Sequence, residues 1–285
     1  MVSIHIPYGT PPVNPNVELK ERDLHYCGGV IISPNFILTA AHCIFEAKDF
    51  RLMIGSNGLW FSATDSLIFK PEEDSHSMNR TTKRWIKIHD NYRVVNNTQV
   101  NDIALIKTDR PMEFRIENGQ FMSNSVCLPE QSDKQPEGWA RISGWGFTRL
   151  WDPTSKPLCL QSIDSLIIDN NRCGQLFRQT RYYSPFGDYY VRNNFDPGSQ
   201  FCTIASLAPG AASEWSYKGP APADSGSPYV QYSDDRATLV GLLSGGDHEV
   251  HNPALKLTQV SKFRQWIELS VKQSINEINY DKWFP

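Results

Sequence analysis

The stretch CGGVIISPNFILTAAHC, residues 27–43, says more about the fold than any other part of the sequence. Two short apolar runs flank Ser33-Pro34-Asn35, three residues that favour a turn. The stretch therefore predicts two antiparallel strands joined by a tight turn. His42 follows the second strand, between small residues and a cysteine. A single histidine in such a place is usually a packed or surface side chain, so its meaning depends on the rest of the chain.

Length and charge exclude several classes of protein. The chain has 285 residues and a formal net charge of -3, which suits one or two globular domains. It contains no run rich in lysine and arginine, so nucleic-acid binding is disfavoured. No stretch approaches the roughly 20 apolar residues that cross a bilayer, so we expect no membrane contact. The first residues, MVSIHIPYGTPP, do not have the pattern of a signal peptide.

Cysteine spacing leaves two interpretations open. The six cysteines form no C-x-x-C pair, so a zinc or thioredoxin-like site has little support. Cys27 and Cys43 enclose 15 residues, and a disulfide between them would stabilise the fold by about 3 kcal/mol. Disulfides would imply an oxidising compartment. The alternative is six buried free thiols.

Further apolar or alternating runs predict more strands and a late helix. The strand candidates are bounded by turn residues, and the end of the chain has apolar residues at helical spacing. Many short strands followed by one helix favour an antiparallel β-barrel or β-sandwich. The candidate strands are RWIKIHD (84–90), NDIALIKT (101–108), WARISGWG (139–146) and ATLVGLLSGG (237–246), and the apolar helix positions are Val260, Phe263, Trp266, Ile267 and Val271.

Two other stretches supply an acid and a nucleophile. VNDIALIKT places Asp102 at the head of an apolar strand, and PADSGSPYV places Ser225 in a turn rich in glycine and proline. A serine hydroxyl needs a base to take its proton and a third group to orient that base. His42, Asp102 and Ser225 supply these groups in the chain order His, Asp, Ser, which differs from the order in subtilisin and in α/β-hydrolases.

The ordered set of motifs resembles the chymotrypsin/trypsin family of serine proteases. The matching stretches are CGGVIISPNFILTAAHC, NDIALIK, VCLP, SGWG, DSGSP, LVGLLSGG and VSKFRQWI. The resemblance implies an all-β fold of two six-stranded antiparallel β-barrels with a C-terminal helix. It implies one peptidase domain over residues 1–285, with the N-terminal barrel at about 1–125, the C-terminal barrel at about 126–258 and the helix at about 259–275.

The resemblance also assigns roles. His42 would be the general base, Asp102 would orient it, and Ser225 would attack the peptide carbonyl. The backbone N–H groups of Ala223 and Ser225 would form the oxyanion hole. The reaction would need no metal or organic cofactor.

The implied setting is extracellular. The resemblance pairs Cys27 with Cys43 and Cys173 with Cys202. It implies a secreted monomer whose partners are protein or peptide substrates and protein protease inhibitors.

Several positions depart from the family pattern. Ala223 and Ser227 replace glycines, and Ala221 replaces a pocket cysteine. The substrate-pairing strand is Ser244-Gly245-Gly246, where the family has Ser-Trp-Gly. These departures support an alternative function, a non-catalytic homologue that acts as a binding or regulatory module. The added Cβ of Ala223 restricts the backbone angles that the oxyanion hole needs.

A second group of departures concerns the N-terminus. Asp224 is present, but the Ile-Val-Gly-Gly-like segment whose ammonium group pairs with it in the family is not found. Cys127 and Cys159 lack their usual partners unless they pair with each other. We hypothesise that the given chain lacks its true N-terminus.

Substrate preference follows from two positions. Gly219 stands six residues before Ser225, where trypsin-like members carry an aspartate that binds lysine or arginine. The opposite pocket wall aligns with Ala254 or Leu255, and a leucine there would shrink the pocket. We expect cleavage after a small or medium apolar side chain.

Two other kinds of short motif give weaker evidence about function. His248 and His251 are three residues apart, but no third metal ligand is evident, so zinc is disfavoured. Asn79-Arg-Thr and Asn96-Asn-Thr match the acceptor sequence for N-glycosylation, which suits a secreted surface.

Overall fold

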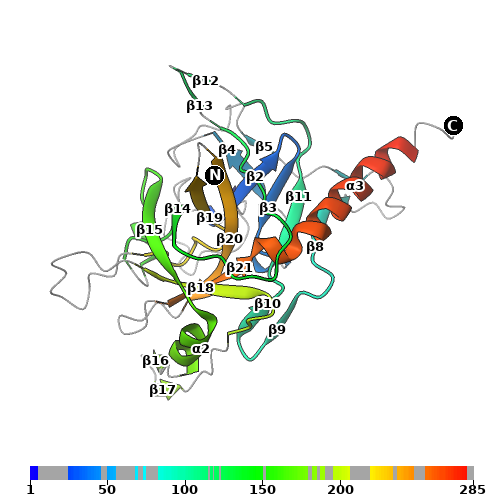
Figure 1. Ribbon diagram of the computed structural model, residues 1–285. Helices are drawn as coiled ribbons and strands as arrows, with labels where there is room; N and C mark the ends of the chain where they lie inside the picture. The colour runs from blue at the N-terminus through cyan, green and yellow to red at the C-terminus, as the bar shows by residue number, and fades with distance from the viewer. Residues whose placement is uncertain are drawn as a thin grey trace.

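A computed structural model shows that the chain is built mainly of β-strands (Figure 1). The structure describes residues 1–5, 25–45, 50–55, 68–69, 73–74, 83–114, 116–117, 119–121, 123–149, 152–178, 182–184, 187–189, 195–205, 219–233, 236–246 and 254–280. No helix in these ranges is long and apolar enough to cross a membrane.

The N-terminal half forms a barrel-like sheet of seven antiparallel strands in the order β5-β4-β1-β2-β3-β11-β8. The predicted turn at Ser33-Pro34-Asn35 is confirmed, because β2 ends at Ser33 and β3 begins at Phe36. The seventh strand, one more than expected, is the two-residue β5. The strands are β1 (Val2–His5), β2 (His25–Ser33), β3 (Phe36–Thr39), β4 (Arg51–Ile54), β5 (Ile68–Phe69), β8 (Ile86–Ile88) and β11 (Ala104–Lys107).

The C-terminal half is the predicted six-stranded barrel, closed in the order β14-β15-β18-β21-β20-β19. Its interior holds an apolar cluster that includes Phe201, Tyr229, Leu243 and Leu255. The strands are β14 (Trp139–Gly144), β15 (Gln161–Ile168), β18 (Gln200–Ala205), β19 (Pro228–Ser233), β20 (Arg236–Gly246) and β21 (Ala254–Gln259).

Short hairpins and helices surround these two sheets. The hairpins are β6 (Glu73–Asp74) with β7 (Lys83–Arg84), β9 (Arg93–Val95) with β10 (Thr98–Val100), β12 (Ile116–Glu117) with β13 (Gln120–Phe121), and β16 (Tyr182–Ser184) with β17 (Gly187–Tyr189). The helical elements are α1 (His42–Phe45), the 3₁₀ turn η2 (Pro153–Ser155), α2 (Asn170–Arg178), the 3₁₀ turn η3 (Val260–Phe263) and α3 (Arg264–Tyr280).

The C-terminal helix exists as predicted but is longer. It begins as η3 and continues as α3 to Tyr280, and α3 extends away from the body of the molecule (Figure 1). Phe263 and Ile267 are buried, as the helical spacing predicted.

One apolar cluster joins the two halves. It contains Leu38 and Leu105 from the N-terminal sheet, Leu242 from the C-terminal barrel, and Phe263 and Ile267 from the final helical segment. Each of these side chains is at most 5% exposed. Burial of apolar surface contributes about 25 cal/mol per Å², so the cluster holds the two halves in one fixed arrangement. The candidate site lies along this junction.

Both predicted disulfides are present, so the alternative of six free thiols is wrong. Cys27 bonds to Cys43 and Cys173 bonds to Cys202. The first ties β2 to α1, the element that carries His42. Cys127 and Cys159 are exposed free thiols and do not pair with each other.

Candidate active site

His42 and Asp102 are joined by two hydrogen bonds. The His42 ring nitrogen Nδ1 lies 2.8 Å from Oδ2 of Asp102, and the backbone N–H of His42 donates to Oδ1 at 2.9 Å. The carboxylate is fully buried, whereas 21% of the His42 side chain is exposed. The carboxylate therefore fixes both the ring and the backbone of the histidine, which still has one side open to solvent.

This geometry selects one tautomer of the imidazole. An ionised carboxylate only accepts hydrogen bonds, so Nδ1 carries the proton and Nε2 keeps its lone pair. Burial lowers the pKa of His42, but the charge of Asp102 and its hydrogen bond outweigh burial and raise the pKa above its usual value of 6.5. His42 is thus arranged to accept a proton at Nε2 and to be stabilised once it holds it.

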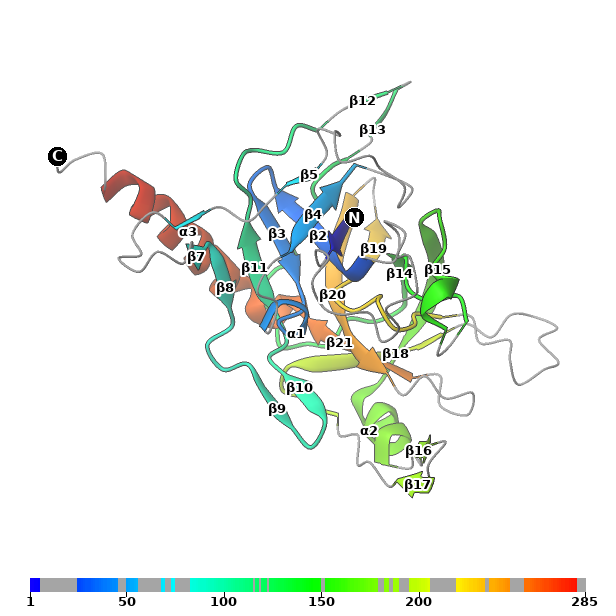
Figure 2. The same cartoon turned by 180° about the vertical axis from the view of Figure 1, so that it is seen from behind.

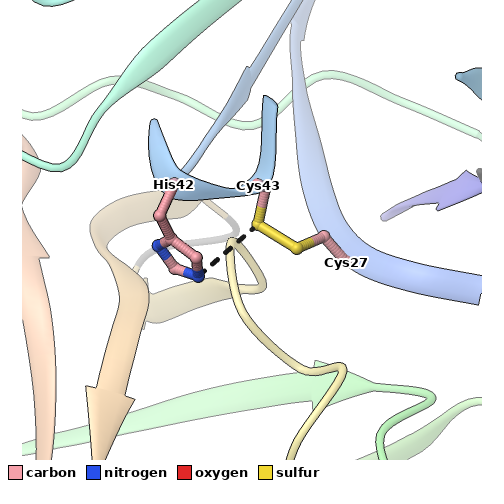
Figure 3. Close-up of side chains that lie close together, drawn as sticks. All are labelled: Cys27, His42 and Cys43. Carbon is pink, nitrogen blue, oxygen red and sulfur yellow. Dashed lines mark hydrogen bonds between the residues drawn. A yellow bond between two sulfur atoms is a disulfide. The ribbon is translucent and has the colours of Figure 1, made fainter. Parts of the chain in front are cut away.

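Sulfur atoms lie close to the same ring. Sγ of Cys43 is 3.8 Å from Nε2 of His42, and Figure 3 shows the ring beside the Cys27–Cys43 disulfide. The grouping of one histidine and two cysteines has the donor types of a metal site. Because the two sulfurs are bonded to each other, neither is available as a thiolate ligand. We therefore interpret the contact as packing of the ring against the disulfide.

Asp102 is also held from the C-terminal barrel. The hydroxyl of Ser244 on β20 donates to Oδ2 at 2.7 Å, and the hydroxyl of Thr258 on β21 donates to the Asp102 carbonyl at 2.8 Å. Burial raises the pKa of Asp102, but the charge of His42 and the hydrogen bonds from His42 and Ser244 bring it below 3.8. The carboxylate therefore stays ionised although it is buried. Ser244, predicted as a residue of the substrate pocket, thus also supports Asp102, and no local pattern in the sequence indicates this bond.

The loop of Ser225 packs against the segment that precedes His42. The N–H of Gly28 donates to the Ser225 carbonyl at 2.7 Å, and the N–H of Gly226 donates to the Leu243 carbonyl at 2.7 Å. Gly226 has φ +76°, and a Cβ there would collide with Thr39 and with the Gly28 carbonyl. This close approach places Ser225 at the junction where His42 and Asp102 lie. Ser225 itself is half-buried.

Ser225 Oγ has no hydrogen bond to His42, or to any other residue that the structure describes. Such contacts between nucleophile and base are often long in ligand-free proteins and shorten when substrate binds. The structure therefore brings the three predicted residues to one junction and directly bonds two of them.

Ala223 adopts a conformation that side chains rarely take, with φ +77°. Its carbonyl lies 3.0 Å from Nε2 of His25, and Nδ1 of His25 lies 2.6 Å from the hydroxyl of Ser3. His25 is buried, which lowers its pKa well below 6.5, so it is neutral and bridges β1 to this loop.

Within the described chain, the N–H groups of Ala223 and Ser225 donate to no protein acceptor. Two backbone donors without a protein acceptor, two residues apart, are what a proposed oxyanion hole at this loop requires.

Asp224 is buried between these two residues. Its carboxylate accepts the N–H of Gly146 at 2.7 Å and the N–H of Ala221 at 2.9 Å. Burial raises its pKa to about 6, and the two backbone hydrogen bonds only partly oppose this. In the described ranges no cation forms an ion pair with it. When the carboxylate is ionised, two backbone hydrogen bonds therefore offset only part of the free-energy cost of burying its charge.

Comparison with known proteins agrees with this geometry. The family model described as Trypsin matches residues 8–267, which is most of the chain. This chain belongs to the trypsin family of serine proteases. It is 27% identical to U21-ctenitoxin-Pn1a of Phoneutria nigriventer over 94% of this chain and 93% of that protein.

Other relatives are similarly distant. Trypsin epsilon of Drosophila erecta is 29% identical, over 90% of this chain and 82% of its own length. Collagenase of Hypoderma lineatum is 26% identical, over 89% of this chain and 79% of its own length. These relatives place the chain in the hydrolase class of the trypsin family.

The four residues predicted to line the substrate pocket of this trypsin-family chain differ in burial. Gly219, Gly245 and Gly246 are half-buried, whereas Ser244 is buried and bonded to Asp102. A Cβ on Gly245 would lie 3.9 Å from Cε of Lys256 and 4.0 Å from Oε1 of Gln99. The lysine stem and the glutamine therefore border the space that a larger residue would occupy.

The two candidates for the opposite pocket wall face different sides of β21. Leu255 packs in the apolar barrel cluster with Leu243, the residue before Ser244. Ala254 packs with the Cys173–Cys202 disulfide instead. Leu255 is thus part of the barrel core, and Ala254 lies against the disulfide outside it.

Ser227, the second departure from glycine, is buried beside Gly28. Its hydroxyl has no hydrogen-bond partner among the residues that the structure describes. His248 and His251 lie outside the described residues, as does Asn79.

Proposed function

We propose that this chain is a secreted serine endopeptidase that hydrolyses peptide bonds through an acyl-enzyme. The observation that supports the proposal most is the His42–Asp102 pair, in which Nε2 carries no proton, set at the same junction as the Ser225 loop. Two disulfides are in keeping with folding in an oxidising, extracellular compartment.

The residues would act in sequence. Nε2 of His42 removes the proton from Ser225 Oγ as that oxygen attacks the carbonyl carbon. Asp102 stabilises the imidazolium that forms, and the N–H groups of Ala223 and Ser225 bind the oxyanion. His42 then gives the proton to the leaving amine. Water, activated by His42, releases the acyl group from Ser225.

The preferred substrate would carry a small or medium apolar side chain before the cleaved bond. Gly219 offers no charge for lysine or arginine, and a leucine at the wall that aligns with Ala254 or Leu255 would take up space in the pocket. The leucine would therefore favour short apolar side chains over long basic ones.

Hydrolysis of a peptide library by the purified full chain tests this proposal. We expect cleavage after alanine, valine or leucine, which Ser225→Ala abolishes. Cleavage mainly after lysine or arginine would contradict the substrate preference. Hydrolysis that persists in the variant would contradict the role of Ser225.

The alternative is a binding module that has kept the fold and lost the chemistry. The strained Ala223 is the observation in its favour. Its backbone N–H group donates to no described protein acceptor, as that of Ser225 does not, which supports the enzyme over this alternative. A folded protein that cleaves no peptide in the library would support this alternative.

A further inference from the structure

The β9–β10 hairpin presents an asparagine at its tip. Val95 on β9 pairs with Thr98 on β10, so the turn consists of Asn96 and Asn97 alone. These have φ 48° and 60°, the left-handed conformation at both positions that marks a type I′ turn. Asparagine adopts this conformation more readily than most residues. Asn96 is exposed, and both figures of the whole molecule show the hairpin projecting from its body (Figures 1 and 2).

The turn contains a glycosylation acceptor sequence. Asn96-Asn97-Thr98 has the form Asn-x-Thr, whereas the second residue after Asn97 is Gln99. Two adjacent asparagines with the same backbone conformation thus differ in one respect, since only Asn96 is an acceptor. Thr98 is 1% exposed, so the folded hairpin hides the threonine that a transferase must recognise. Transfer must therefore precede folding, and folding then leaves the modified side chain in solvent.

The base of the same hairpin borders the candidate active site. The carbonyl of Gln99 accepts a hydrogen bond from Nε2 of Gln200 at 2.9 Å, and that amide also lies 3.4 Å from the Ser244 hydroxyl. Asn101, which follows β10, directly precedes Asp102. A strand advances about 3.3 Å per residue, and Asn96 follows Val95, which pairs with Thr98. Asn96 therefore lies about 7 Å further along the hairpin than Gln99.

We propose that Asn96 carries an N-linked oligosaccharide, and that this oligosaccharide hinders folded proteins from reaching the candidate active site. The donor is a polyprenyl-diphosphate-linked oligosaccharide. A bond forms between Nδ2 of Asn96 and C1 of the first sugar, while the bond from C1 to the diphosphate oxygen breaks. The lipid diphosphate and one proton from Nδ2 leave. The oligosaccharide is bulky and hydrophilic. It extends from the tip of the β9–β10 hairpin and hinders a large folded substrate from approaching the candidate active site.

The first test is the intact mass of the full chain, exported by insect cells behind a cleavable leader. All proteins carry Asn79→Gln, so that the other acceptor sequence is absent. The matched variants are Asn96→Asp and Asn97→Asp, which make the same change at neighbouring turn positions that tolerate aspartate. We expect the oligosaccharide mass in the parent and in Asn97→Asp, and its loss in Asn96→Asp or after peptide-N-glycosidase treatment. A folded, exported parent with an unmodified Asn96 would overturn the proposal.

The second test concerns shielding and rests on the proposed function. The parent, Asn96→Asp and Asn97→Asp are compared on a short peptide and on a folded protein that contains the same peptide in a loop. We expect the ratio of kcat/KM for the folded protein to that for the peptide to rise in Asn96→Asp only. An unchanged ratio would overturn the shielding role. If no form cleaves the peptide, the proposed function fails, while the mass measurement still decides whether Asn96 is modified.

Discussion

Ala223 holds a backbone conformation that its own Cβ disfavours. A left-handed φ costs a residue with a side chain about 1–2 kcal/mol, and glycine avoids this cost. We therefore expect Ala223→Gly to raise the free energy of unfolding by about 1 kcal/mol, because part of the gain is offset by the flexibility of glycine in the unfolded chain. Urea denaturation measures the change.

The matched control is Ala221→Gly, in the same loop. Ala221 is buried and is not among the residues with positive φ, so glycine there should destabilise the protein by about 1 kcal/mol. If both variants lower the free energy of unfolding to the same extent, the left-handed conformation of Ala223 carries no energetic cost.

Asp102 raises the pKa of His42 and selects its tautomer. Since the reaction needs neutral His42, kcat/KM should fall tenfold per pH unit below that raised pKa. Asp102→Asn removes the charge that raises the pKa of His42. Burial then dominates, so the pKa of His42 drops, and kcat should fall by about 10⁴ because the tautomer is no longer fixed.

Ser244→Ala removes only one hydrogen bond to Oδ2 of Asp102 and should lower kcat by about 10–100-fold. Rates and an NMR titration of His42 check this, and a higher His42 pKa in Asp102→Asn would refute it.

At the scale of elements, the Ser225 loop depends on its close contact with β2 and β3. Gly226→Ala adds a Cβ that meets backbone atoms of Gly28 and Ala40, so the loop must move. Gly119→Ala is the control, because Gly119 has φ +77° but nothing lies within 4 Å of its added Cβ. We expect about 1 kcal/mol of destabilisation at Gly119 and about 2–4 kcal/mol at Gly226, with lost peptide hydrolysis only at Gly226. Equal effects in thermal unfolding would contradict the docking of this loop.

Strands whose apolar residues form the core could be predicted from the sequence, and exposed elements could not. The hairpin of β2 and β3 has an apolar run on each side of a clear turn, and its side chains are mostly buried. The β9 strand has only exposed residues, so its sequence carries no alternation that would reveal it. Helix α2 begins after Asp169, whose carboxylate accepts the N–H groups of Asn171 and Arg172, so this aspartate is the local signal for the helix start.

The sequence predicts only those residues of the site that belong to a local motif. His42, Asp102 and Ser225 each stand in a recognisable stretch. The hydrogen bond from Ser244 to Asp102 spans 142 residues and depends on how the two halves pack. The contact of His25 with the Ala223 carbonyl spans 198 residues for the same reason. Neither contact leaves a local pattern in the sequence.

At the scale of the whole molecule, the buried Asp224 makes stability depend on pH. Its pKa rises from 3.8 in the unfolded chain to about 6 in the fold, so between these values the native state binds more protons. Stability from this group is therefore present below about pH 4 and lost as pH rises through about 6, by about 3 kcal/mol in total.

Asp224→Asn does not titrate, so its stability relative to the parent should increase by about this amount between pH 4 and pH 7. Asp164→Asn is the control, because the hydrogen bond and charge of Arg141 lower the pKa of the exposed Asp164 and give the opposite trend. Urea unfolding at several pH values measures both. If the difference in free energy of unfolding between Asp224→Asn and the parent does not change with pH, burial does not raise the pKa of Asp224.

We propose that His42, Asp102, Ser225 and the N–H groups of Ala223 and Ser225 form a working site across the junction of the two halves. Fluorophosphonate labelling of the folded full chain, followed by intact mass, tests it most directly, because the reagent reacts fast only with a serine that has its base and oxyanion hole. We predict one adduct, located at Ser225, which is absent in Ser225→Ala and slow in His42→Ala. The absence of an adduct on a chain whose near-ultraviolet circular dichroism shows a packed core would contradict a working site at Ser225.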